Sequence, residues 1–505
     1  DRGDLSRRRR SGDYWRTLLE ARYDGGGVVS LDPKLMEMLV YRQSPYYMME
    51  DTYERNAAFY ANADYTFDRR YSISASARYD GSNQLGRGAA KRWLPTWTFA
   101  GKWIISNEAF MENASRIVDF MSLRASYGLT ANIPPSASNA MALYYNQELY
   151  RPGNAEVGIT LADLQNTELT WEKNYQLNVG FDLTLFGGRL DFNVDYFNRQ
   201  GFDLISQIKV AGIGGFMWKN ANYADLDSQG VDITLGGKMI STKDWTWSAH
   251  FTFGYSKNII RNAKNSPEVF ELVRQEGGNK NNYPVNSLFS IPFAGLNPET
   301  GIPMFYNEKG EIGYDCYMQG IETDFLKYEG QIDPKYTGGL NTTLRWKSLS
   351  MNLFFTFQAG NVIRLNPVFS SSYSDITALP NEFKDRWIMS GDEQRTDIPA
   401  IADNLMQKLY LSSAYPYNNY NYSSARVAKG DFIRLKSLSI NYELPSALVR
   451  KSRVFKRAAV RLTAKDLWLM YSDKALNGQD PEFFTAGGVA MPVQTQFVLS
   501  LDLGF

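Results

Sequence analysis

Apolar and polar residues alternate with a period of two along most of the chain after residue 54. In the last twelve residues, QTQFVLSLDLGF, every phenylalanine and leucine has one parity, and Val498 is the one apolar residue of the other. Such alternation is typical of a strand with one apolar and one polar face. About 13 segments show it and are predicted to be strands. They are residues 55–67, 69–79, 97–105, 120–129, 175–185, 189–198, 231–235, 245–255, 340–346, 349–357, 431–444, 457–468 and 497–505.

The links between these segments are alternately short and long. Short links follow residues 67, 186, 239 and 346, and two links of intermediate length, 106–119 and 445–456, take the same places in the series. The long links are residues 80–94, 130–172, 200–228, 257–338, 359–430 and 469–494. A soluble β-sandwich also alternates apolar and polar residues, but it has no reason to place every long loop at one end. A transmembrane barrel does, since its periplasmic turns are short and its external loops are long.

The predicted strands also suit a lipid environment. Nearly all of them reach the roughly 9–11 residues needed to cross a bilayer at a tilt. The clearest apolar faces contain no Lys, Arg, Asp or Glu, and a cation at the middle of the lipid would cost about 2–4 kcal/mol. These faces run from Phe59 to Phe67, Tyr71 to Tyr79, Tyr175 to Leu185, Leu190 to Tyr196 and Phe497 to Phe505. The sequence therefore predicts an all-β protein, a transmembrane antiparallel β-barrel with long extracellular loops and short periplasmic turns.

The order of short and long links also gives the direction of each strand. The last strand runs inward, so Phe505 is expected at the periplasmic rim, where this strand would close the barrel against the first one. Segment 55–67 also runs inward, which makes residues 1–54 an extracellular loop segment and residues 55–505 the C-terminal part of the barrel. A plug domain and an odd number of further strands are then expected outside this chain. The start at Asp1, without methionine or an apolar signal core, agrees with a fragment or a processed chain.

Composition narrows the classes of function. Lysine plus arginine and aspartate plus glutamate number 54 each, so the chain has no overall basic field for nucleic acid. The lone Cys316 and the lone His250 exclude a multi-cysteine zinc site and a multi-histidine metal site. No run of about 18 apolar residues predicts a transmembrane helix. No carboxylate pair stands out for catalysis, so we expect no enzyme, no cofactor and no metal.

Ten stretches, in one order, carry a family resemblance. They are SLDPKL (30–35), ISASARYDGSNQLG (73–86), LPTWTFAGKWIISNEAF (94–110), LTWEKNYQLNVGFDLTLFGGRLDFNVDYFNR (169–199), SQGVDITL (228–235), FAGLNPETGIPMF (293–305), PKYTGGLNTTLRWKSLSMNLFF (334–355), KGDFIRLKSLSINYELP (429–445), KDLWLM (465–470) and GQDPE (478–482). Together with the terminal strand they resemble the C-terminal barrel of the SusC/RagA family. These proteins are the outer-membrane TonB-dependent transporters of Bacteroidetes.

The resemblance implies a function and a set of partners. Family members are ~22-stranded barrels that hold a plug domain and import oligosaccharides or oligopeptides. A SusD-like surface lipoprotein covers the barrel, pairs of complexes commonly dimerise, and TonB acts through the N-terminal half. For this chain the resemblance implies an outer-membrane, multi-pass location. It also implies a separate or cleaved N-terminal half that supplies the plug and about nine strands.

One aromatic loop is a candidate contact for substrate or lid. The stretch SAYPYNNYNYSS (413–424) contains Tyr415, Tyr417, Tyr420 and Tyr422 beside Asn418 and Asn419. Aromatic faces stack on sugar rings or peptide groups, and amides supply hydrogen bonds. An external loop buried beneath a partner would have the same composition, so both interpretations remain open.

Charged residues on the polar parity of the strands are expected to line the lumen. These candidates are Asp182, Asp191, Asp195, His250, Arg345 and Lys465. We expect most of them to hold the plug and water networks and a few to touch cargo. For His250 a hydrogen-bonding role is favoured over a metal, and GLNPETG (295–301) is favoured as a turn because its spacing does not match a calcium loop.

Other functions remain open on the same barrel. A siderophore or cobalamin receptor would use the same type of barrel, and a passive porin would have a similar strand pattern. Open conductance in planar bilayers would distinguish the porin, because a plugged transporter is nearly silent.

Overall fold

The computed structural model describes most of the chain. The described residues are 2–15, 47–86, 88–134, 142–151, 154–163, 166–210, 218–264, 266–367, 381–401, 415–445, 449, 454–486 and 494–504. Within them, no helix has both the length and the apolar character needed to cross a membrane.

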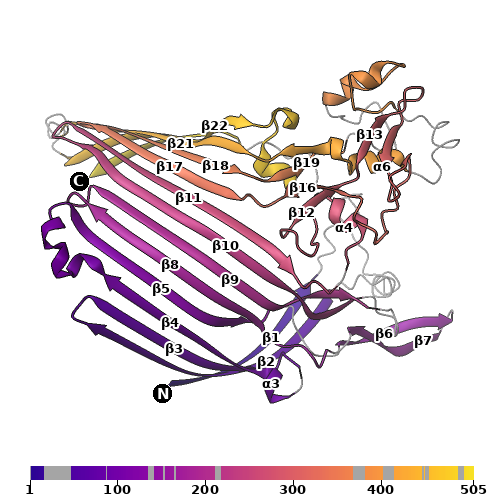
Figure 1. The fold of residues 1–505 in the computed structure, drawn as a ribbon, viewed down its shortest axis with the longest axis horizontal. Helices are drawn as coiled ribbons and strands as arrows, with labels where there is room; N and C mark the ends of the chain where they lie inside the picture. Colours follow the sequence, from indigo (N-terminus) through magenta and orange to yellow (C-terminus); the bar gives the residue numbers. More distant parts are fainter. Residues whose placement is uncertain are drawn as a thin grey trace.

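One antiparallel sheet of 14 strands dominates the structure. Its strands, in spatial order, are β1 (Arg2–Trp15), β2 (Tyr47–Phe67), β3 (Tyr71–Ser82), β4 (Trp93–Ile104), β5 (Val118–Asn132), β8 (Glu172–Leu185), β9 (Leu190–Lys209), β10 (Trp218–Ser241), β11 (Trp245–Arg261), β17 (Tyr336–Trp346), β18 (Leu349–Ala359), β21 (Phe432–Glu443), β22 (Arg457–Ser472) and β23 (Gln496–Gly504). Every strand of this sheet except β1 falls on a predicted segment. The short links lie together at one end of the strands and the longer connections at the other, called here the short-turn end and the long-loop end (Figure 1).

The prediction that residues 1–54 are a loop segment is wrong in part. Arg2–Trp15 forms strand β1, which pairs with Tyr47–Tyr60 of β2. The sequence of β1, RGDLSRRRRSGDYW, has no period-two alternation. Pairing with the ladder of β2 supplies its backbone hydrogen bonds, and these do not depend on side-chain pattern.

The long connection expected at residues 200–228 is also mostly strand. β9 continues to Lys209 and β10 starts at Trp218, with their register kept across two bulges. The alternation stops before the strands do because polar residues interrupt the apolar rows here. Asn198, Gln200 and Gln229 occupy the positions that follow the apolar rows. Periodicity therefore detects the part of a strand that has an apolar face and misses its extension.

The sheet has one apolar and one polar face. Neighbouring strands place Phe181, Val194, Ile233 and Phe253 in one row of the apolar face. Large side chains of this face are exposed, as for Phe59 at 61%. A surface so apolar needs lipid or another apolar cover.

Aromatic pairs mark the two limits of the apolar face. Trp245 stacks on Trp346 at the short-turn end, and Tyr255 lies against Tyr336 toward the long-loop end. From Trp245 to Tyr255 the strand rises about 24 Å, at about 3.4 Å per residue and a tilt of about 45°. This height agrees with the apolar band of outer-membrane barrels, which is about 25 Å tall and bordered by aromatic girdles.

Turn geometry explains how β8 and β9 connect so tightly. Gly187 and Gly188 both have positive φ, at 70° and 73°, a region that glycine enters without strain. A carboxylate oxygen of Asp119, from the neighbouring strand β5, accepts hydrogen bonds from both glycine N–H groups at 2.6 and 3.0 Å.

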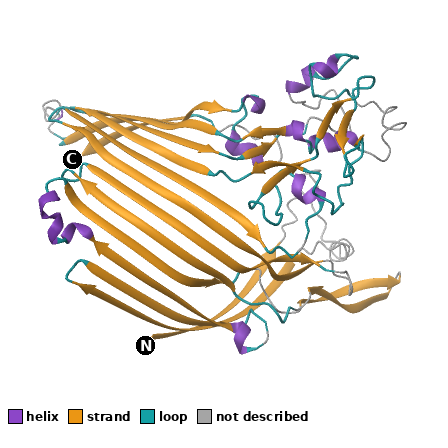
Figure 2. Ribbon diagram, viewed as in Figure 1, coloured by secondary structure: helices purple, strands orange, loops and turns teal. Residues whose placement is uncertain are grey.

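The remaining elements lie at or beside the two ends of the sheet (Figure 2). The strands are β6 (Ala142–Arg151), β7 (Asn154–Asp163), β12 (Ser287–Ser290), β13 (Phe293–Leu296), β14 (Pro303–Tyr306), β15 (Ile312–Gly313), β16 (Lys327–Gln331), β19 (Val362–Arg364) and β20 (Val427–Lys429). The helices are α3 (Ala89–Arg92), α4 (Val269–Val273) and α6 (Pro416–Asn421), with 3₁₀ turns η1 (Ile105–Asn107), η2 (Ala109–Ala114), η3 (Asn381–Asp385), η4 (Asp392–Gln394), η5 (Ser424–Arg426), η6 (Lys474–Leu476) and η7 (Pro481–Ala486).

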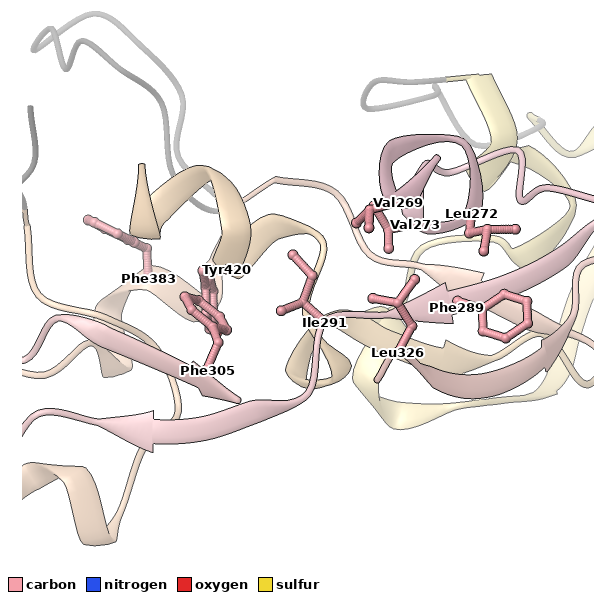
Figure 3. Packing of buried hydrophobic residues seen from close by; sticks show 9 residues of the cluster. All are labelled: Val269, Leu272, Val273, Phe289, Ile291, Phe305, Leu326, Phe383 and Tyr420. Carbon is pink, nitrogen blue, oxygen red and sulfur yellow. The ribbon is translucent and has the colours of Figure 1, made fainter. Parts of the chain in front are cut away.

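Two long connections join into a unit with its own core. We call residues 266–334, 361–367, 381–401 and 415–430 the loop subdomain. Its core contains Val269, Leu272, Val273, Phe289, Ile291, Phe305, Leu326, Phe383 and Tyr420, all buried (Figure 3). Segments more than a hundred residues apart in sequence thus pack together at the long-loop end.

Candidate functional site

The polar face of the sheet is the candidate functional site. One hydrogen-bond network on this face is centred on Arg124 of β5, which joins β8 and β9. One guanidinium nitrogen donates to Asp182 on β8 at 3.0 and 2.9 Å, and another donates to Asp195 on β9 at 2.5 and 2.7 Å. Asp182 also accepts from Ser122 at 2.9 Å and from Asn193. The two carboxylates are therefore held in place and share one cation.

Gly180 makes room for this bridge. A Cβ at that position would lie 2.3 Å from Nε of Arg124 and 2.5 Å from a carboxylate oxygen of Asp195. The guanidinium therefore occupies the space above Gly180 and reaches both carboxylates at once. The sequence shows the two aspartates and the glycine, but nothing local indicates which arginine joins them.

The other predicted lumen residues share the polar face by register. Asp191 accepts a hydrogen bond of 2.9 Å from Thr184, and the ring of His250 lies over Gly236 of the neighbouring strand. Arg345 faces Thr246 and Ser350 in its ladders. Lys465 pairs with Ser437 and Gln496. Their exposure to a lumen remains a prediction.

The tyrosine-rich loop divides into buried and exposed residues. Tyr417, Tyr420 and Asn419 are at most 2% exposed, so we withdraw the expectation that they contact substrate or lid. Tyr420 packs against Phe293, with ring centroids 5.7 Å apart, and burial raises the pKa of its phenol to about 12.

Three other members of the candidate set differ from these. Tyr415 and Asn418 are exposed on the same loop. Tyr422 is half-buried, and its ring meets Phe270 edge-on at 5.8 Å. Tyr415, Asn418 and the partly exposed Tyr422 remain candidates for a contact with substrate or lid.

Three buried arginines hold the long connections in place, and none of them was predicted from the sequence. Two of them, Arg364 and Arg426, join segments of the loop subdomain to one another. Arg364 donates to the carbonyls of Ser423 and Phe289 at 2.7 and 2.6 Å, and burial lowers its pKa to about 9. Arg426 donates to Glu382 at 2.6 Å.

The third arginine explains the GQDPE stretch. Arg434 projects from β21 and is held by the carboxylates of Asp480 and Glu482. Charge-assisted hydrogen bonds of this kind are the strong ones in proteins. The stretch thus attaches part of the connection between β22 and β23 to the 14-stranded sheet, which is called the wall below.

The GLNPETG stretch is the turn that its sequence predicted. The side chain of Asn297 accepts hydrogen bonds from the backbone N–H groups of Glu299 and Thr300, at 2.8 and 3.2 Å. Gly301 has a φ of 66°, and a Cβ there would lie 2.4 Å from the Trp387 ring. In the described part of the chain, no group of three or more His, Cys, Asp or Glu is placed to hold a metal ion.

A hollow of about 790 Å³ lies on the polar face near the long-loop end of β2–β5. Half of its lining residues are uncharged and polar. These residues are Asn56, Tyr60, Asn62, Ser76, Gln84, Thr96, Thr98, Thr130 and Asn132. Its charged lining residues are Arg78 and Asp80, whose side chains lie 2.6 Å apart. Such a surface can bind a polar molecule through hydrogen bonds.

Comparisons with known proteins agree with this architecture. Residues 3–444 match the family model described as TonB dependent receptor-like, beta-barrel. TonB-dependent receptor P3 of Formosa agariphila is 27% identical over 440 residues, which are 84% of this chain and 41% of the receptor. TonB-dependent receptor SusC of Bacteroides thetaiotaomicron is 24% identical over 235 residues, which are 46% of this chain and 22% of SusC.

A solved structure gives the same fold. A chain in the structure of the RagAB peptide transporter superposes with a TM-score of 0.73 at 23% identity, covering 91% of this chain and 48% of that one. At this identity the likeness establishes the fold alone. The present chain spans less than half the length of each of these relatives.

Proposed function

Because the chain belongs to the TonB-dependent receptor-like β-barrel family, we propose that it forms the C-terminal part of a SusC/RagA-type barrel that imports oligosaccharides or oligopeptides across the outer membrane. The family consists of outer-membrane receptors and transporters rather than enzymes. The observation that carries the proposal is the two-faced sheet. Its apolar face suits lipid, and its polar face contains a hydrogen-bonding hollow near the long-loop end, where cargo would enter.

The proposed importer needs an N-terminal half. This half, as a separate or cleaved chain, would supply the plug, the contact with TonB and the remaining strands. Since β1 adds one strand to those predicted from the sequence, a ~22-stranded barrel needs about eight more rather than about nine. The unpaired edges support this idea, because β1 and β23 each pair on one side only within the described residues. An open edge is not tolerated in lipid.

A SusD-like surface lipoprotein is the proposed lid. The loop subdomain lies at the end where such a partner would bind, and it exposes Tyr415 and Asn418 there. Aromatic side chains are enriched at protein interfaces. A dimer of such complexes completes the proposed assembly.

Mass spectrometry of the detergent-purified complex tests the assembly. We expect a second polypeptide that carries a plug and about eight strands, together with a lipidated partner. A native mass equal to this chain alone would contradict the proposed barrel.

Uptake by a deletion strain tests the activity. Loss of growth on one oligosaccharide or peptide source, restored by the intact gene, is expected. Unchanged growth on every such source would sink the import proposal. Open conductance of the complex in planar bilayers would indicate a porin, and iron-regulated expression without a lipoprotein partner would indicate a siderophore receptor.

A further inference from the structure

The hollow on β2–β5 has a chemical character that narrows the cargo. Its two charged residues neutralise each other, since Nε of Arg78 donates to both carboxylate oxygens of Asp80 at 2.6 and 2.8 Å. The rest of the polar lining consists of hydroxyl and amide groups. A hydroxyl can donate and accept, and an amide side chain offers both functions from two atoms. The hollow therefore presents many hydrogen-bonding groups and no net charge.

The register arranges these groups in two rows. Asn62, Ser76 and Thr98 lie side by side on β2, β3 and β4. Neighbouring strands are about 4.8 Å apart, so the row offers a polar group at each such interval. Among the described residues, the side chains of this row make no hydrogen bond, which leaves them available to a ligand.

The second row lies two residues closer to the long-loop end. It contains Tyr60, Arg78 and Thr96, at a distance of about 6.8 Å from the first row along the strands. Tyr60 adds an aromatic ring, whose face packs well against the C–H groups of a sugar. Together the rows form a grid with the dimensions of a pyranose ring and its hydroxyls.

We propose that this hollow is a subsite for one neutral pyranose unit of an oligosaccharide cargo. The inference rests on the proposed import function and narrows its cargo to uncharged glycans. A peptide is a poorer fit, because its termini and ionised side chains would meet no unpaired charge in the hollow. Burying a charge without a partner is costly.

The Arg78–Asp80 pair makes the subsite selective against acidic sugars. While Asp80 holds Arg78, a uronate carboxylate has no free cation to bind and approaches a second carboxylate. Replacing Asp80 by asparagine keeps the shape of the side chain and leaves Arg78 without its counterion. The Asp80→Asn variant should therefore accept acidic sugars that the native protein rejects.

Isothermal titration of the complete detergent-purified complex tests these statements. The probes are neutral oligosaccharides released from starch, xylan and arabinan, oligogalacturonides as acidic sugars, and a tryptic digest of casein as peptides. We expect native protein to bind a neutral probe only. Ser76→Ala and Thr98→Val should each weaken that binding about 3- to 10-fold, the equivalent of one hydrogen bond. Asp80→Asn should strengthen oligogalacturonide binding by about 10-fold.

Ser248→Ala is the matched control, because it removes a hydroxyl from the polar face of β11, away from the hollow. Its affinity should equal that of the native protein, and heat-modifiable migration on a gel should show that every variant is folded. Preferential binding of peptides, or equal affinities for Ser76→Ala and Ser248→Ala, would overturn the subsite. If either of these results were obtained while cells still took up substrate, the import function would stand without the subsite. If cells took up none of the probes, the import function would be overturned as well.

Discussion

The wall of the sheet and the loop subdomain place their large apolar side chains in opposite ways. On the wall Leu499 is 73% exposed and Phe59 is 61% exposed, on a face that suits lipid. In the loop subdomain Phe289 and Tyr420 are each 1% exposed, and both belong to the same buried cluster. Side chains of the same types are therefore stabilised on the wall by an apolar environment outside the protein and in the loop subdomain by close packing within it.

The largest expected effect comes from removing a ring from the buried core. Phe289 lies against Tyr283 and Tyr328, with ring centroids 5.0 and 5.4 Å away. Phe289→Ala should leave a cavity and cost the loop subdomain about 3–5 kcal/mol. Hydrogen exchange should then rise across residues 266–334 while unheated electrophoretic migration of the barrel stays the same. Phe67→Ala, which removes an exposed ring from the wall, is the control and should cost less.

A charge on the apolar face should damage the wall in turn. Phe99 is exposed at the middle of β4, where arginine should cost about 2–4 kcal/mol. Ala100 lies on the polar face of the same strand, so Ala100→Arg should have little effect. The measurement is the urea midpoint of the barrel in lipid vesicles. Equal midpoints for the two variants would mean that the two faces of β4 have been assigned to the wrong environments.

Glycine substitutions sharpen the contrast between the two faces of the wall. Gly180→Ala would force Cβ into the space of Arg124 and Asp195 and should cost about 1–3 kcal/mol. Gly101 of β4 lies on the apolar face, and a Cβ there would have open space around it. Gly101→Ala should be neutral or slightly stabilising. Thermal melts of both variants in the same detergent test this ordering. A melting temperature for Gly101→Ala below that of Gly180→Ala would contradict it.

The smallest effect is expected at the short-turn end, and it depends on pH. Glu108 accepts hydrogen bonds from Tyr71 at 2.6 Å, Trp103 at 3.0 Å and Arg70 at 3.2 Å. The first two donors, in that order, hold the pKa of this carboxyl below its usual range, and Arg70 adds to them.

A carboxyl with a lowered pKa in the folded state stabilises that state at pH values above its ordinary pKa. This contribution is lost as the pH falls from about 5 through the folded pKa. A fluorine probe on the Trp103 indole should therefore shift on acidification of the native protein. In Glu108→Gln the same probe should stay constant, and a shift of equal size there would assign the effect to another group.

The strands were predictable because their signal is local. Alternation in 245–255 or 349–357 is visible in a short window, and the two-faced environment of the wall imposes it directly. β1 was not predictable in this way, since its backbone pairs with β2 without any alternating side chains. The extension of β9 past the apolar rows was missed for the same reason.

The candidate site was predictable only by residue type and parity. Asp182 and Asp195 were expected on the polar face, where they lie, but their partner Arg124 is more than fifty residues away in sequence. Tyr417 and Tyr420 had the composition of either a binding loop or a core. The packing of α6 against β13 and β14 decided for the core.

The amino-acid sequence alone predicts the two-faced strands, the alternation of short turns and long loops, and the barrel family. Each of these is written in neighbouring residues or in a series of motifs. Three-dimensional packing sets which loop tyrosines are buried, which arginines hold the loops, and where the polar face forms a hollow. These features arise where residues distant in sequence meet, and their free energy depends on burial and on partners that no local pattern specifies.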